Sequence, residues 1–130
     1  MIVVDASVVV QVLIADEVGL ELADRLAGHA EELAAPHLLD LEVASALRTL
    51  ARSRTVSAAM AASAIADLRA LRIERHSHEE FLTRIWALRD ELTIYDAAYV
   101  ALAEALHADL WTRDRRLSRA RLARCRIELL

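Results

Sequence analysis

The chain has 130 residues, of which 56% are hydrophobic and 28% charged, and its formal net charge is −4. This composition excludes a disordered chain and predicts one globular domain, 1–130, large enough to bury its own core. No apolar run approaches the ~20 residues of a membrane span, and we find no signal peptide. A single cysteine, Cys125, cannot form an internal disulfide, so we expect a cytoplasmic protein.

Missing residue types exclude three common functions of α/β proteins. All sixteen basic residues are arginine, and Gly19 and Gly28 are the only glycines. A phosphate-binding loop needs a Gly-Lys-Ser/Thr run, and a dinucleotide turn needs the three glycines of GxGxxG. A two-component receiver domain uses a lysine beside its acidic pocket. The chain therefore belongs to none of these classes.

The first half of the chain begins with an apolar strand over 2–4. We expect helices over 7–14 and 17–29, followed by a short strand over 33–35. Pro36 stands where a helix can begin, and Leu38, Leu41, Ala44 or Ser45, and Leu47 then repeat at helical spacing. Another helix, rich in alanine, is predicted from Ser57 to about residue 71.

The second half continues the alternation of strands and helices. A strand is predicted over 73–76, and Ser77-His-Glu-Glu80 has the spacing of a capping box that opens a helix to about residue 91. The helix from about Tyr95 is followed by a strand near 110–111, a short helix from Arg115 and a last strand over 126–129. Since no hairpin turn joins two strands, we predict a three-layer α/β/α sandwich around a parallel sheet of about five strands.

Four acidic residues stand where this topology gathers functional groups. Asp5 ends the first strand and Asp114 follows the strand near 110–112, so both belong at the carboxyl edge of the sheet, where open α/β folds bind ligands. Asp96 lies in the first turn of a helix, and Glu42 lies inside a helix among apolar neighbours. Each aspartate also fits a structural role as a helix cap. Glu42 does not, because a cap cannot stand in a helix interior, and a buried glutamate needs partners.

A group of carboxylates requires either raised pKa values or a cation. Two charges ~4 Å apart repel by ~4 kcal/mol at an effective dielectric constant near 20. Oxygen-only ligands suit Mg²⁺ or Mn²⁺, and such an ion with open positions hydrolyses phosphate esters. The five histidines show no pairing on a shared helix face, which disfavours zinc.

Arginines and hydroxyls surround the last of these acids. Seven arginines and one acid, Asp114, lie between Trp111 and Arg126. This run is either a solvated helix end or a phosphate-binding strip that holds a polyanionic substrate. The arginines that we assign to this strip are Arg113, Arg115, Arg116 and Arg119. Ser7 and Thr112 are candidates to orient a carboxylate or a bound water.

Four segments of the chain resemble, in the same order, the acidic motifs of PIN-domain ribonucleases, specifically the VapC-type toxins of bacterial toxin–antitoxin pairs. These segments are VVDAS, LEVASAL, YDAAYVALAEAL and TRD. The resemblance covers almost the whole chain. It implies a five-stranded parallel sheet and an endoribonuclease that depends on Mg²⁺ or Mn²⁺. It also implies an RNA substrate, a VapB-type antitoxin that blocks the site, a homodimer, and DNA binding only through the antitoxin.

The family's functional positions map onto this chain residue by residue. The acids that match its metal-binding and catalytic positions are Asp5, Glu42, Asp96 and Asp114. Ser7 and Thr112 match its accessory hydroxyls. Ser45 stands where many relatives carry asparagine, and Arg115 and Arg116 occupy a stretch where some relatives add a fifth acid. We therefore expect one firmly bound metal ion, with a second recruited together with RNA.

Two other functions fit parts of the sequence. A phosphatase of the haloacid dehalogenase type also begins with an apolar strand and an aspartate, but it needs an acid where Ser7 stands and a lysine that this chain lacks. A binding subunit of an antitoxin complex would use apolar stripes, such as Leu13, Leu22 and Leu26, for a partner helix, although such stripes more often pack the core. An oxygen-bound Mn²⁺ ion at the four acids would favour the nuclease.

Overall fold

A five-stranded parallel sheet forms the centre of the molecule. The computed structural model describes residues 1–30 and 32–130. The strands are β1 (Ile2–Val4), β2 (Leu33–Pro36), β3 (Glu74–His76), β4 (Asp109–Thr112) and β5 (Ile127–Leu129). They lie in the order β3-β2-β1-β4-β5, and every neighbouring pair is parallel. The predicted sheet is therefore confirmed.

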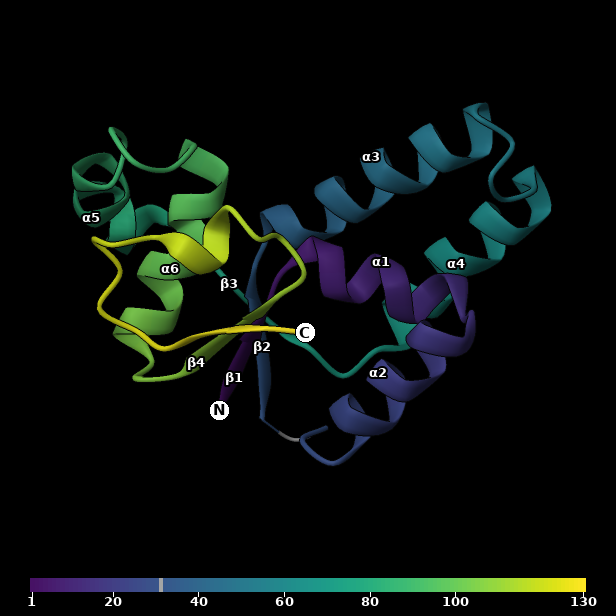
Figure 1. The fold of residues 1–130 in the computed structure, drawn as a ribbon, viewed down its shortest axis with the longest axis horizontal. Coiled ribbons are helices and arrows are strands. Elements are labelled where there is room, and N and C mark those ends of the chain that lie inside the picture. Colours follow the sequence, from purple (N-terminus) through teal and green to yellow (C-terminus); the bar gives the residue numbers. More distant parts are fainter. Residues whose placement is uncertain (31) are drawn as a thin grey trace.

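Helices connect these strands and cover both faces of the sheet. They are α1 (Ala6–Ile14), α2 (Glu17–Ala27), α3 (Leu38–Arg52), α4 (Ala58–Ala70), α5 (Leu82–Ala87) and α6 (Ile94–Ala105). Figure 1 shows α5 and α6 on one side of the sheet and α1, α2 and α4 on the other, while α3 and α4 project beyond it as an arm. This is the predicted α/β/α sandwich. No helix in the described ranges has the length and apolar character needed to cross a membrane.

The apolar sequence of β1 and α6 explains how they pack. All three residues of β1 are buried, as expected for a central strand covered on both faces. Seven consecutive residues of α6, Ala97–Ala103, are buried, and four of them are alanines that let the helix lie close to β1, β2 and β4. This packing fixes the first turn of α6, which carries Asp96, beside the carboxyl end of β1.

The start of α3 differs from the sequence prediction. Pro36 is the last residue of β2, where it is paired with His76 of β3, and the helix begins only at Leu38. Leu41, predicted to face the core, is 76% exposed. The residues of α3 that are buried are Leu39, Val43 and Leu47, an apolar stripe that shares Leu47 with the predicted one. Leu41 therefore belongs to the surface.

Three other helix boundaries also differ. The helix predicted over 77–91 is a 3₁₀ turn η1 (Glu79–Phe81) followed by α5, because Ser77 Oγ accepts the N–H of Glu79, two residues on, and so makes a tight turn rather than a capping box. The short helix predicted from residue 115 is the 3₁₀ turn η2 (Leu117–Arg119). The helix predicted to reach residue 29 ends at Ala27.

Candidate active site

Asp5 lies directly after β1 and is the N-cap of α1. Its Oδ1 accepts the backbone N–H of Val8 at 3.2 Å, and it also accepts the hydroxyl of Ser7 at 2.6 Å. The hydroxyl of Thr112, the last residue of β4, donates to Oδ2. Asp5 is therefore both a helix cap and a buried acid, so the two interpretations of its sequence position hold together.

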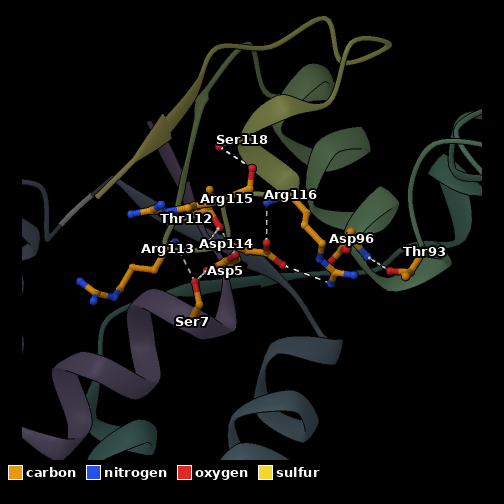
Figure 2. A network of polar contacts seen from close by, with 10 residues as sticks. All are labelled: Asp5, Ser7, Thr93, Asp96, Thr112, Arg113, Asp114, Arg115, Arg116 and Ser118. Atoms are coloured by element: carbon orange, nitrogen blue, oxygen red, sulfur yellow. Dashed lines mark hydrogen bonds and ion pairs between the residues drawn. The ribbon is translucent and has the colours of Figure 1, made fainter.

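The two hydroxyls tie the loop after β4 to Asp5. Ser7 Oγ accepts the N–H of Arg113 at 2.8 Å, and Thr112 Oγ1 accepts the N–H of Asp114 at 2.9 Å. Each hydroxyl thus accepts a hydrogen bond from a backbone N–H and donates one to the Asp5 carboxylate. Figure 2 shows how this network brings Asp5 and Asp114 together from opposite ends of the chain.

Glu42 is held by a residue that the sequence analysis did not single out. The buried Tyr99, on α6, donates its hydroxyl to Glu42 Oε2 at 2.6 Å. Burial and the nearby Glu42 raise the pKa of Tyr99, so this hydroxyl remains a proton donor. A buried glutamate requires such a donor, but the pattern of the sequence did not identify which helix supplies it.

Asp96 lies in the first turn of α6, as predicted. Thr93 is the N-cap of that helix, and its Oγ1 accepts the backbone N–H of Asp96 at 3.1 Å. The hydroxyl of Thr93, rather than the carboxylate of Asp96, therefore caps the helix. The Thr93 side chain also hydrogen-bonds the Asp96 carboxylate, which opposes the effect of burial on the pKa of Asp96.

Asp114 follows β4, and both of its carboxylate oxygens contact Arg116. The backbone N–H of Arg116 donates to Oδ1 at 2.7 Å, and Nη2 of the same residue lies 3.4 Å from Oδ2. Asp114 also accepts the backbone N–H of Ser118 through its carbonyl oxygen at 3.0 Å. Asp114 thus begins the turn that leads into η2, but the N-cap of η2 is Arg116 and it makes no side-chain cap bond, so the interpretation of Asp114 as an N-cap is wrong.

The four acids act on one another electrostatically. Burial is the largest cause of the raised pKa values of Asp5, Glu42 and Asp96. The charges of Asp96 and Asp5 raise the pKa of Glu42 further, and the charge of Asp114 raises that of Asp96. Oxygen donors with such mutual repulsion fit a hard divalent cation. Within residues 1–30 and 32–130, however, no three His, Cys, Asp or Glu side chains already form a metal-coordinating group.

A pocket of about 450 Å³ between α1 and α3 opens beside these acids. Ser7 and Glu42 line its inner end, and the predicted accessory residue Ser45 lines it one helical turn further, with Thr49 beyond. Ser45 makes no contact with Glu42 that would replace an asparagine side chain. Its exposed hydroxyl instead faces the pocket, so it is a wall of the pocket rather than part of the Asp5 network.

The predicted arginine strip divides into two parts. Arg115, Arg116 and Arg119 are exposed and Arg113 is half-buried; of these, Arg116 contacts the acid Asp114. Arg126 lies before β5 and pairs with Asp109, at the amino end of β4, so it faces the opposite edge of the sheet. Between them, Glu91 accepts the backbone N–H groups of residues 121 and 122, which fixes the path of the segment.

Comparison with known protein families and curated proteins assigns this arrangement to one family. The model of the PIN domain matches residues 2–122. The chain is 42% identical over 130 residues to ribonuclease VapC9 of Mycobacterium tuberculosis and to VapC ribonuclease Mb0985 of Mycobacterium bovis. These alignments cover 100% of this chain and 98% of each relative.

Two solved structures share the fold. PAE2754 from Pyrobaculum aerophilum superposes with a TM-score of 0.73 at 28% identity, covering 97% of this chain and 81% of that protein. VapC20 of Mycobacterium tuberculosis, described as a sarcin-ricin loop cleaving toxin, superposes with a TM-score of 0.70 at 16% identity, covering 97% and 99%. The resemblance seen in the four acidic motifs is confirmed, and the chain belongs to the PIN-domain family, among its VapC ribonucleases.

Proposed function

We propose that this protein is the endoribonuclease toxin of a toxin–antitoxin pair and hydrolyses RNA phosphodiester bonds with the help of a divalent cation. The observation that carries the proposal is the electrostatic coupling of four acids, Asp5, Glu42, Asp96 and Asp114. Burial raises the pKa values of the first three, and neighbouring acids raise those of Glu42 and Asp96 further. The relatives named as ribonucleases support the reaction class.

The donor set favours Mg²⁺ or Mn²⁺ as the cation. The four acids supply only oxygen atoms, and no histidine or cysteine contributes to the hydrogen-bond network of Asp5 or Glu42. When bound, such a cation would lower the pKa of a coordinated water and neutralise charge that develops on the phosphate. We assign its binding to the four acids, whose side chains must close around it.

The remaining residues of the site hold these acids and the substrate. Ser7 and Thr112 orient the carboxylate of Asp5, and Tyr99 orients Glu42. The RNA backbone is held by arginines, whose planar guanidinium groups match phosphate. The arginines that we assign to this role are Arg113, Arg115, Arg116 and Arg119. The pocket lined by Ser45 and Thr49 extends the site along α3.

We also propose a homodimer, and an exposed apolar face supports it. Trp86 on α5 is 62% exposed, and an apolar pocket of about 200 Å³ is lined by the exposed side chains of Leu82, Ile94 and Tyr95. A face that carries both projecting side chains and a pocket fits a second copy of itself. Acids 79 and 80 begin η1 and Arg89 follows α5, so two such segments placed antiparallel would pair opposite charges.

Two further partners follow from the assignment to the VapC ribonucleases. We propose that a VapB-type antitoxin blocks the acid site, and that contact with DNA occurs only through this antitoxin. We place the protein in the cytoplasm, where its RNA substrate is found.

The reaction is tested by incubating structured RNA with the protein in Mg²⁺, in Mn²⁺ or in EDTA. We expect cleavage only with a divalent cation, and none from a variant that combines Asp5→Asn, Asp96→Asn and Asp114→Asn. A matched variant combines Asp24→Asn, Asp67→Asn and Asp90→Asn, which removes three exposed carboxylates elsewhere and should leave cleavage intact. Cleavage by the first variant, or full activity in EDTA, would refute the proposal.

A further inference from the structure

Arg116 engages Asp114 in two ways. Its backbone N–H bonds Oδ1 at 2.7 Å, and its guanidinium reaches Oδ2 at 3.4 Å. The backbone bond leaves room for a second partner on Asp114, but the guanidinium occupies the other carboxylate oxygen. One oxygen of a proposed cation ligand is therefore already paired with a positive charge of the same chain.

The guanidinium also acts on a second acid. Figure 2 shows the Arg116 side chain directed toward Asp96, whereas the side chain of Arg113 points the opposite way. The positive charge of Arg116 lowers the pKa of Asp96 and so opposes the effects of burial and of Asp114. The positive charge of Arg116 thus offsets the negative charges of Asp96 on α6 and Asp114 in the loop after β4.

This ion pair is weak enough to exchange. The Arg116 side chain is 83% exposed, and exposed pairs contribute at most about 1 kcal/mol because water screens them. A divalent cation carries twice the charge and coordinates carboxylate oxygens directly. It therefore displaces the guanidinium at little cost, and the backbone bond from residue 116 to Asp114 keeps the arginine beside the site.

We propose that Arg116 is a positioning residue that exchanges partners. Its guanidinium pairs with Asp114, on the side that faces Asp96, until a divalent cation takes the Asp114 carboxylate, and it then binds the RNA phosphate that the cation also contacts. Cation binding and RNA binding are coupled through this one side chain. A bound cation releases the guanidinium for the RNA phosphate, and a bound phosphate releases the carboxylate for the cation. The inference rests on the proposed cation-dependent reaction and adds a residue that regulates it.

The test compares Arg116→Gln with Arg113→Gln, a neighbouring variant with the same change of charge. Binding of Mn²⁺ to the full chain without RNA is measured by electron paramagnetic resonance of the free ion and by calorimetry. We expect Arg116→Gln to bind Mn²⁺ about 2- to 5-fold more tightly than the wild type, the range that an exposed ion pair allows. Arg113→Gln should bind it as the wild type does.

The second half of the exchange is read from steady-state cleavage at saturating Mn²⁺. Arg116→Gln should raise KM for RNA several-fold with a smaller change in kcat, because a phosphate contact is lost. Thermal unfolding of both variants verifies that the fold is intact.

The possible results separate this inference from the proposed function. Equal Mn²⁺ affinity in the two variants overturns the exchange, and so does a tighter Mn²⁺ site with unchanged KM. If even the wild type binds no Mn²⁺ at millimolar concentration, the cation-dependent reaction itself is refuted.

Discussion

Tyr99 and Glu42 lie 57 positions apart in the chain, yet their hydrogen bond links α6 to α3 at the site. The sequence analysis placed Glu42 correctly in a helix interior and inferred that it needs a partner. It could not name Tyr99, because the choice of donor depends on how two helices from separate layers cross. Ser7 and Thr112 were easier to identify, since Thr112 ends β4 and Ser7 lies two residues after Asp5, which follows β1.

Removing the Tyr99 hydroxyl should affect the reaction without unfolding the protein. In Tyr99→Phe, Glu42 loses the hydrogen bond that lowers its pKa, so burial raises that pKa further. We expect kcat/KM to fall by about 10-fold, which corresponds to one hydrogen bond to a charged group, and the acidic limb of its pH profile to move to higher pH. Tyr95→Phe changes an exposed tyrosine and is the control. Identical pH profiles for both variants would contradict this role.

At the scale of elements, the order of strands and helices along the chain was predictable, whereas the face that α3 buries was not. Alternating apolar strands and helices were enough to predict the parallel sheet. In LLDLEVASAL, however, two apolar stripes overlap. Leu39, Val43 and Leu47 are buried, while Leu41 faces outward. Periodicity alone cannot choose between such stripes, since both repeat at helical spacing.

If the exposed apolar face around Trp86 joins two copies of the chain, a charge placed on it should separate them. We expect Trp86→Asp to shift the protein from dimer to monomer in sedimentation velocity, with at least a 10-fold weaker dimer, because a central aromatic residue often contributes 2 kcal/mol or more to an interface. Leu20→Asp is the control, since Leu20 is 58% exposed on α2, away from the face. A monomeric wild type, or equal dimerisation of both variants, would rule this face out.

For the whole molecule, the four acids proposed to bind the cation lower the stability of the folded chain when no cation is present. A carboxyl whose pKa is raised by folding is protonated in the folded state at a pH where the unfolded chain has already lost the proton. Its contribution to stability is therefore present below the ordinary value, 3.8 for aspartate, and is lost as pH rises through the raised value. At neutral pH the gathered charges oppose folding, and a cation among them removes that opposition.

Thermal unfolding without divalent cations should show this balance. We expect Asp96→Asn to unfold on the order of 2–4 °C above the wild type at pH 7, and the difference to shrink as pH is lowered toward 4. Saturating Mn²⁺ should raise the unfolding temperature of the wild type more than that of the variant, since only the native site binds the ion. A variant that is less stable at pH 7 and equally stabilised by Mn²⁺ would show that Asp96 is a purely structural residue.

Because one carboxylate both closes the first turn of α1 and faces the candidate catalytic centre, the choice of inactivating allele at position 5 matters. Alanine would remove the cap oxygen along with the charge. Loss of activity in that variant would then not distinguish a missing catalytic group from an unfolded and degraded protein. Asparagine keeps an oxygen for the N–H of Val8 and ranks with aspartate as a helix cap. It is thus the substitution that yields a non-toxic yet folded protein, suited to producing the toxin in quantity and to capturing intact RNA.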